Sequence, residues 1–164
     1  MPHTRETLLA ELGKLQIPHV VVDHEPVFTV EQAKALRGEI AGVHVKNLFL
    51  KDKKDQLWLV VCEEAVTVDL KSLPDRIGAA RLSFGKADLL REVLGVEPGS
   101  VTPFSAINDR EKRVKVVLDQ EVAEGPTVCC HPLVNTATVS LSSADLLKFL
   151  RSVDHEPLIV DIVG

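Results

Sequence analysis

A lysine and an asparagine stand side by side in an otherwise apolar stretch, Val43-His44-Val45-Lys46-Asn47-Leu48-Phe49-Leu50. Alternate side chains of a β-strand point to opposite faces, so Lys46 and Asn47 would lie on opposite sides of a sheet. Burying either polar group without a hydrogen-bond partner is unfavourable. The pair is therefore a candidate for binding or catalysis. The alternative is a lysine whose ammonium reaches water, beside an asparagine near a strand bulge.

A second candidate is the turn-rich loop Gly99-Ser100-Val101-Thr102-Pro103. Glycine allows the backbone to approach a ligand closely, and proline stiffens the far end of the loop. Loops of this kind can present backbone amides to an oxygen that gains negative charge during acyl transfer. The alternative is a simple connection between a helix and a strand, which is the commoner role of such loops.

The third candidate is Cys129-Cys130-His131-Pro132. Adjacent strand residues point in opposite directions, so Cys130 and His131 are poorly placed to form a thiolate–imidazole pair. Zinc would require further ligands at suitable spacing, and Cys62 is isolated, so we expect no metal site. His131 leaves a strand into a proline turn, which favours a residue that lines a pocket.

Other catalytic templates are missing from the sequence. It contains no Gly-x-Ser-x-Gly elbow, no phosphate-binding P-loop, no Gly-x-Gly-x-x-Gly fingerprint and no His-Glu-x-x-His helix. Basic residues gather in the stretch 110–115, directly after the glycine–proline loop. This stretch is either a solvated strand edge or a rim that faces phosphate.

The composition predicts a single domain over residues 1–164, with enough apolar residues, 45%, for a sizeable core. We expect no membrane segment and, because no signal peptide is visible, a cytoplasmic protein. Three cysteines, two of them adjacent, do not make a disulfide framework. A net charge of −5 and 4% aromatic residues argue against a general DNA-binding protein and against a broad base-stacking platform.

The hydrophobic patterns predict an α/β (α+β type) fold, with a mixed, largely antiparallel sheet flanked by helices. We expect a hairpin from strands 43–50 and 56–63, and a capping box at Thr29 that begins a short helix. The other expected strands are 18–23, 114–119, 127–130, 136–141 and 158–163. One helix is expected to begin near residue 4. Four others are expected over residues 29–37, 67–77 (interrupted near Pro74), 85–94 and 142–151.

In order and spacing, these features resemble one family, the YbaK-like or ProX-type prolyl-tRNA editing domains. The resemblance covers about residues 20–150. It rests on His24-Glu25-Pro26-Val27-Phe28-Thr29, Lys46-Asn47-Leu48-Phe49-Leu50, Gly99-x-x-x-Pro103-Phe104, and His131-Pro132-Leu133 with Asn135 and Thr136.

This resemblance implies a barrel-like sheet with surrounding helices and a hydrolase that cleaves a wrong amino acid from the 3′ end of proline tRNA. The free-standing, alanine-specific type is the nearest in its motifs, while a sister group removes cysteine. The implied partners are the acceptor end of tRNA(Pro) and prolyl-tRNA synthetase, with no cofactor. A non-catalytic module that binds tRNA or a nucleotide is the alternative.

The resemblance also implies roles for single residues. Lys46 would hold the phosphate or ribose of the terminal adenosine, and Asn47 would bind the aminoacyl group or the attacking water. Gly99 would supply backbone amides to the ester oxygen, and His131 would narrow the pocket. The remaining implied substrate-binding residues are Thr29, Ser100, Val101, Thr102, Pro103 and Pro132. The terminal hydroxyl of the tRNA would help to activate water, so no protein nucleophile is needed.

Overall fold

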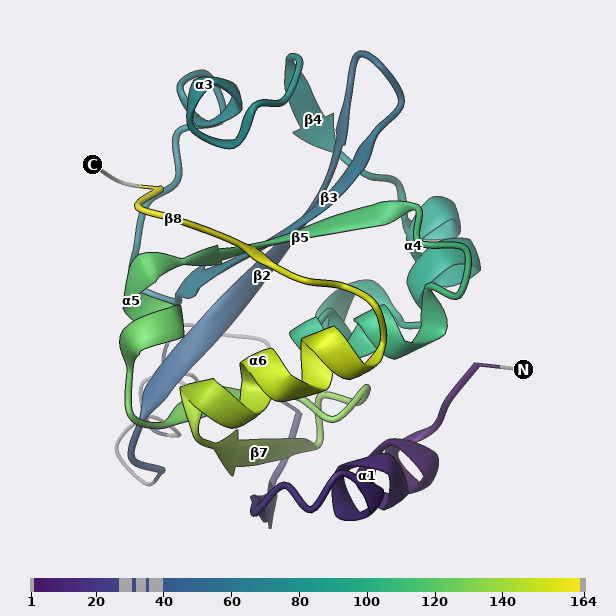
Figure 1. The fold of residues 1–164 in the computed structure, drawn as a ribbon, viewed down its shortest axis with the longest axis vertical. Coiled ribbons are helices and arrows are strands. Elements are labelled where there is room, and N and C mark those ends of the chain that lie inside the picture. The colour runs from purple at the N-terminus through teal and green to yellow at the C-terminus, as the bar shows by residue number, and fades with distance from the viewer. Residues whose placement is uncertain (1, 27–30, 32–34, 36–39, 163–164) are drawn as a thin grey trace.

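The computed structural model describes residues 2–26, 31, 35 and 40–162 (Figure 1). Its strands are β1 (Val20–Asp23), β2 (Val43–Asp52), β3 (Leu57–Glu63), β4 (Leu82–Phe84), β5 (Val114–Asp119), β6 (Val128–Cys130), β7 (Ala137–Leu141) and β8 (Leu158–Val160). The α-helices are α1 (Arg5–Lys14), α3 (Leu73–Ile77), α4 (Ala87–Leu94), α5 (Gln120–Glu124) and α6 (Ser143–Ser152). Two 3₁₀ turns, η1 (Pro98–Ser100) and η2 (Pro103–Asn108), follow α4.

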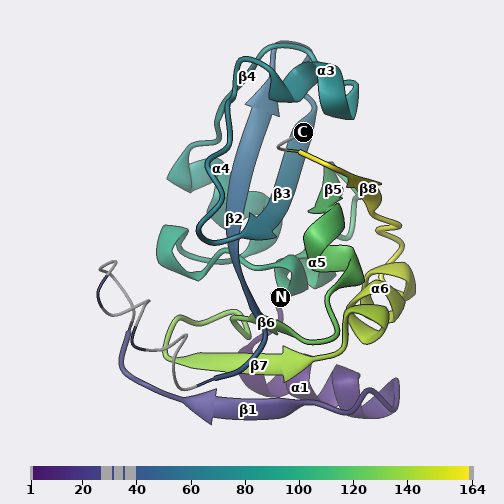
Figure 2. The same cartoon turned by 90° about the vertical axis from the view of Figure 1, so that its left-hand side faces the viewer.

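The described strands form one mixed sheet in the order β1-β7-β6-β2-β3-β5-β8, with β4 paired to β2. The pairs β1–β7, β6–β7, β2–β3 and β2–β4 are antiparallel, while β2–β6, β3–β5 and β5–β8 are parallel. Figure 2 shows β1 and β7 running across the direction of β2 and β3, so the sheet bends sharply at β2. The predicted mixed sheet with flanking helices is confirmed. The sheet is bent and open, because its end strands β1 and β8 do not pair with each other in the described residues.

Strand β2 separates two apolar cores because its side chains alternate between the faces of the sheet. Phe49 lies in the larger core, which helices α1, α4 and α6 complete. Leu50 lies in the smaller core, to which α3 contributes Leu73 and Ile77. A residue of β2 therefore faces one core or the other according to whether its number is odd or even.

The β2–β3 hairpin is fixed by the carboxylate of Asp52, which is buried at the end of β2. It accepts hydrogen bonds from the backbone N–H groups of Lys54 and Gln56 and from the indole of Trp58. Its second oxygen accepts a hydrogen bond from the N–H of Ala80, just before β4. These bonds lower the pKa of Asp52 although its burial opposes them. One carboxylate thus ties β4 to the turn of the predicted hairpin.

The helix ends follow the sequence signals where residues are described. The hydroxyl of Thr4 accepts a hydrogen bond from the N–H of Thr7 at the start of α1, and that of Ser142 accepts one from Asp145 at the start of α6. Gly95 ends α4 with a φ of 65°, a left-handed conformation that glycine adopts without strain.

One predicted helix is shorter than expected, two short elements were not predicted, and a further predicted helix lies mostly outside the described residues. The helix expected over 67–77 occupies only Leu73–Ile77, because Pro74 lacks an N–H and suits the first turn of a helix rather than its middle. Strand β4 and helix α5 were not predicted, since three and five residues are too short to show a period. The helix expected over 29–37 falls mostly on residues outside those described.

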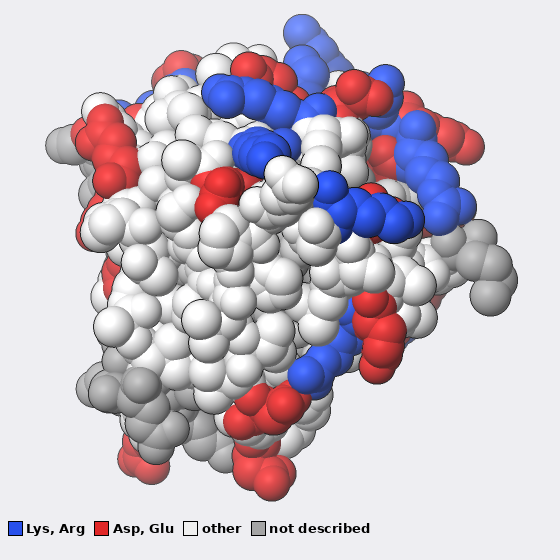
Figure 3. Space-filling model, turned by 60° about the horizontal axis from the view of Figure 1, so that its bottom comes forward, with Lys and Arg blue, Asp and Glu red and all other residues white. Residues whose placement is uncertain are grey.

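The surface is charged unevenly. Seen from the side of α1 and β7, the middle of the molecule carries few charged side chains. Lys and Arg gather mainly toward the upper margin, where Asp and Glu stand among them, and further Asp and Glu lie toward the lower margin (Figure 3). This side offers no continuous basic surface to a nucleic acid. Within the described chain, no helix has both the length and the apolar character needed to cross a bilayer.

A buried ion pair attaches the C-terminal segment to the rest of the fold. His155 Nε2 lies 2.9 Å from Asp109 Oδ2, and both side chains are almost completely buried. Burial alone would lower the pKa of His155, but its bonds to Asp109 and to the Val153 carbonyl raise it. Burial would likewise raise the pKa of Asp109, yet the bonds from His155 and from backbone amides lower it. The charged pair is therefore favoured.

We predict that this pair makes stability depend on pH. A raised histidine pKa contributes stability below the unfolded value near 6.5 and loses it as pH rises through the folded value. The lowered pKa of Asp109 contributes stability at pH values above its ordinary pKa of about 3.8, and this stability is lost as the pH falls below that value. Urea denaturation of the parent and of His155→Gln should differ more at pH 5.5 than at pH 8.5. Asp109→Asn, which leaves half of a buried pair, should cost about 3 kcal/mol. An equal difference at both pH values would contradict a charged pair.

Candidate functional site

Lys46 lies in the middle of β2, opposite Cys62 of β3, on the side of the smaller core. It is half-buried, and its ammonium donates a hydrogen bond to the Val66 carbonyl, in the segment that follows β3. An ammonium has three N–H donors, so two have no partner among the described residues and could bind a ligand. The structure thus orients the lysine and leaves part of its hydrogen-bonding capacity unused.

Asn47 points to the opposite face of β2, where Val45 and Phe49 join the larger core. Its carboxamide oxygen, Oδ1, is buried and has no hydrogen-bond partner among the described residues. An unpaired buried polar atom costs about 1–3 kcal/mol, and native proteins seldom retain one without a reason. This oxygen is the clearest candidate for a ligand-binding atom in the described chain.

The edge of β2 beside these two residues has no strand partner in the described part of the chain. Strand β6 pairs with β2 as far as His44, and β4 begins to pair at Leu50. On this edge Gly85 N–H donates to the Phe49 carbonyl. Because peptide groups alternate between the two edges of a strand, those of Asn47 also face the interval between β6 and β4. The backbone here can bond to something other than a strand.

His131 lies at the start of the connection from β6 to β7. Its Nδ1 donates to the Ala137 carbonyl at 3.0 Å, which leaves Nε2 as the acceptor of a neutral ring. Burial lowers the pKa of His131, and the neighbouring His24 and His44 act in the same direction. The ring centre of His24 is 6.4 Å away. His131 is therefore held in its neutral form.

Two further histidines at this place received no role from the sequence. His24 binds Thr138 Oγ1 at 2.8 Å, and His44 binds the Ile40 carbonyl at 2.7 Å through their Nε2 atoms. A hydrogen bond with Cys129 raises the pKa of His44. The period of the strand could have identified His44, which is two residues from Lys46 and so shares its face.

The Gly99 loop lies against the same β6–β7 connection. A Cβ atom placed on Gly99 would lie 3.4 Å from Asn135 Nδ2, so the loop and the connection touch. Ser100 N–H donates to the Glu97 carbonyl within the turn. The Thr102 hydroxyl is completely buried and accepts the N–H of Phe104. Within this loop, Gly99 and the half-buried Val101 are thus the first candidates for contact with a ligand.

The other predicted site residues differ in how they are placed. Pro103 is buried at the start of η2, and Pro132 is buried beside His131. Thr29 lies outside the described residues. The structure brings His24, His44 and His131 together and sets Gly99 against Asn135. The β6–β7 connection is common to both groups, while β2 contributes Lys46 and Asn47.

Neither cysteine chemistry nor a metal centre is indicated by the described residues. Burial raises the pKa of the Cys62 thiol to about 11 and raises that of Cys130 further. Raised pKa values keep both thiols protonated and poorly nucleophilic. Across the described ranges, no group of three His, Cys, Asp or Glu side chains is arranged to hold a metal ion.

The chain is similar to known proteins. Residues 24–149 match the family described as the aminoacyl-tRNA editing domain. The prolyl-tRNA editing protein ProX of Acetoanaerobium sticklandii is 38% identical over 149 residues, which cover 90% of this chain and 91% of that protein. A prolyl-tRNA synthetase associated domain-containing protein of Danio rerio is 39% identical, over 95% of this chain and 86% of its own length.

More distant relatives extend the comparison. The multifunctional Ser/Thr-tRNA deacylase ProXp-y of Escherichia coli is 27% identical over 90% of this chain and 89% of that protein. A crystal structure of a proposed trans-editing enzyme for prolyl tRNA synthetase superimposes with a TM-score of 0.73 at 18% identity, covering 100% of this chain and 99% of that one. The latter shows the fold alone. Because the family match spans most of the chain and ProX is similar over nearly its full length, the protein belongs to the YbaK/ProX family of aminoacyl-tRNA editing domains.

Proposed function

We propose that the protein is a trans-editing deacylase that hydrolyses alanyl-tRNA(Pro). The single observation that carries this proposal is the buried Asn47 Oδ1, which lacks a partner among the described residues on a strand that also orients the Lys46 ammonium. Membership in the editing family and the similarity to ProX supply the substrate class.

The reaction is hydrolysis of an ester. A water oxygen attacks the carbonyl carbon of the amino acid, the bond from that carbon to the ribose oxygen breaks, and the ribose oxygen takes up a proton. The terminal hydroxyl of the tRNA can assist the water, which removes the need for a nucleophilic side chain. The protein has to position the ester and stabilise charge on its carbonyl oxygen.

The residues of the site have chemistry suited to these tasks. The two remaining donors of Lys46 would hold the phosphate or ribose of the terminal adenosine. Asn47 Oδ1 is an acceptor, so it would receive a hydrogen bond from the amino group of alanine or from the attacking water. Gly99 would supply a backbone amide to the carbonyl oxygen. Neutral His131, with its Nε2 an acceptor, would line the pocket.

Selection of alanine follows from size. Alanine is smaller than proline, so a synthetase pocket made for proline admits it, and each missing methylene provides only about 1–3 kcal/mol of discrimination. A second site too small for proline removes the error. The Escherichia coli relative named for serine and threonine shows that substrate range varies within similar proteins. Cysteinyl-tRNA(Pro) is accordingly the second substrate to test.

We predict that Lys46→Met reduces deacylation of alanyl-tRNA(Pro) by at least about tenfold, because a charge-assisted hydrogen bond contributes about 1.5–3 kcal/mol. Methionine preserves most of the apolar stem, so the melting temperature should change by only a few degrees. Release of labelled alanine from mischarged tRNA measures the effect. Equal rates for variant and parent would remove Lys46 from the mechanism, and binding of the tRNA without release of alanine by the parent would favour a non-catalytic module.

We predict that Asn47→Leu separates stability from activity. Leucine has a similar volume and removes the unpaired buried oxygen, so the free energy of unfolding should stay equal or increase. Deacylation should fall strongly because the ligand loses its acceptor. Urea denaturation and the release assay, run on the same preparations, test both parts. A loss of more than about 2 kcal/mol in stability would show that Asn47 has a structural hydrogen bond instead.

The size argument predicts an order of rates on four substrates. Alanyl-tRNA(Pro) should be hydrolysed fastest, cysteinyl- and seryl-tRNA more slowly, and prolyl-tRNA(Pro) least, in a release assay at equal tRNA concentration. His131→Ala should widen the pocket and raise the relative rate on the prolyl form. Equal rates of the parent on alanyl- and prolyl-tRNA(Pro) would refute exclusion by size.

A further inference from the structure

Phe84 is an exposed aromatic residue on β4, with 64% of its surface accessible. It lies directly opposite Leu50 of β2 in an antiparallel pair. Residues opposite each other in such a pair share a face, and Lys46 shares the face of Leu50 because four residues separate them. The Phe84 ring and the Lys46 ammonium therefore belong to the same face of the sheet.

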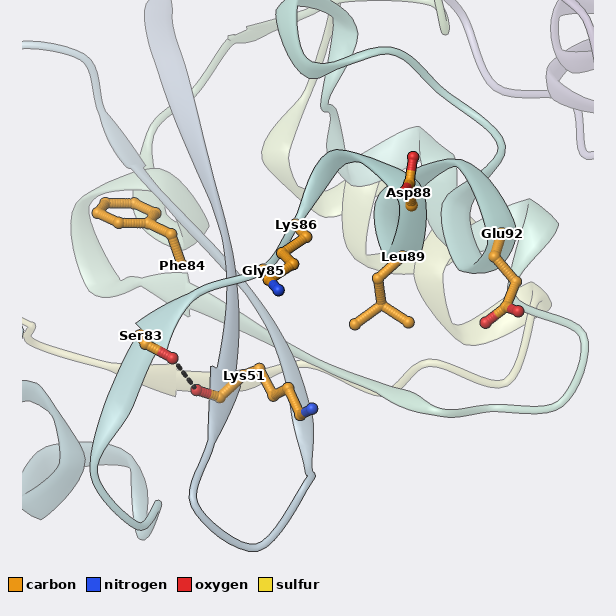
Figure 4. Close-up of a pocket in the computed structure, with 8 residues that line it drawn as sticks. All are labelled: Lys51, Ser83, Phe84, Gly85, Lys86, Asp88, Leu89 and Glu92. Carbon is orange, nitrogen blue, oxygen red and sulfur yellow. Dashed lines mark hydrogen bonds between the residues drawn. The ribbon is translucent and has the colours of Figure 1, made fainter.

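The close-up of this region agrees with that assignment. A cavity of about 470 Å³ lies between β4 and α4, lined by Lys51, Leu89 and Glu92 among others. Figure 4 shows Phe84 directed away from Leu89 and Glu92, to the other side of the strand. Phe84 is thus one of the residues that line this cavity, while its ring is directed away from Leu89 and Glu92.

The backbone that presents Phe84 is tightly held. Gly85 N–H donates to the Phe49 carbonyl, and a Cβ atom on Gly85 would come 2.4 Å from the Phe49 ring. On the other side of β4, the N–H of Ala80 is bound by Asp52. A rigid exposed ring loses little conformational entropy on binding a flat partner.

Basic residues outnumber acidic ones in the two segments that hold β4 and the part of β2 paired with it, although the whole chain carries −5, while Asp88 and Glu92 of α4 line the cavity beside β4. Segments 46–55 and 81–86 hold two acidic residues, Asp52 and Asp55, and six basic ones, Lys46, Lys51, Lys53, Lys54, Arg81 and Lys86. Asp52 is buried and bonded to amides and to an indole, and Asp55 pairs with Lys51 at 3.2 Å. An exposed aromatic ring among cations is the chemistry that binds single-stranded RNA, by stacking on a base while lysine and arginine contact phosphates.

We propose that Phe84 stacks on a base of the unpaired 3′ end of the substrate tRNA, upstream of the terminal adenosine that the Lys46–Asn47 site receives. This inference rests on the proposed function. Four residues of strand separate Lys46 from the position opposite Phe84, roughly 13 Å. That length corresponds to about four stacked nucleotides at roughly 3.4 Å each, and to fewer in an extended strand.

Steady-state deacylation of alanyl-tRNA(Pro) tests this role. Phe84→Ala should raise KM about tenfold and leave kcat nearly unchanged, because stacking contributes roughly 1–3 kcal/mol per base. Phe84→Trp should retain the low KM. Alanyl-adenosine, which lacks upstream bases, should be hydrolysed equally by parent and Phe84→Ala. Leu158→Ala, at another exposed apolar position on β8, is the matched control and should leave KM unchanged. An unchanged KM for Phe84→Ala would overturn the proposal.

A binding measurement separates this proposal from the deacylase itself. An uncharged RNA oligonucleotide of the acceptor end, with 2-aminopurine at successive upstream positions, should lose fluorescence at one position with the parent and not with Phe84→Ala. If that quenching occurs while the parent hydrolyses no mischarged tRNA, stacking stands and the deacylase proposal fails. Dimers of the free parent that Phe84→Ala abolishes, with no quenching, would instead assign Phe84 to a contact between two copies.

Discussion

The alternation of side chains along β2 is the constraint on which the site depends. One strand serves both halves of a bent sheet, pairing with β6 at one end and with β3 and β4 along the rest. Its even-numbered side chains face one core and its odd-numbered ones face the other. A shift of register by one residue would exchange the ammonium and the carboxamide between faces and would also bury Lys46 in the larger core. The cores on both sides therefore fix the register that the site requires.

The polar residues of the site are held by the backbone of neighbouring segments. Carbonyl groups bind Lys46, His44 and His131, which sets the direction of each side chain without using a second charged group. Fixed dipoles of this kind can stabilise charge that develops on a substrate without reorganising during the reaction.

Much of the fold could be predicted because its longer elements have clear periods. The hairpin, strand 114–119 and the helix after Ser142 appear where expected, since each shows an apolar pattern and a terminal signal. The Lys46–Asn47 pair was visible as a polar interruption of an apolar strand. The hydrogen bond of His44 with Cys129 and the contact of Gly99 with Asn135 were not visible, because they depend on which distant segments meet. A total of 4% aromatic residues argues against a broad stacking surface but says nothing about where a single ring lies.

The parallel pairing of β2 with β6 has a consequence for the synthesis of this protein. It joins Val43 to Val128, so the two strands that flank the candidate site are separated by about half of the chain. Contacts between such distant segments form slowly, because a long loop must close first. A nascent chain on the ribosome exposes the completed β2–β3 hairpin well before β6 emerges. The candidate site would thus assemble only after the segment that contains β6 has been synthesised.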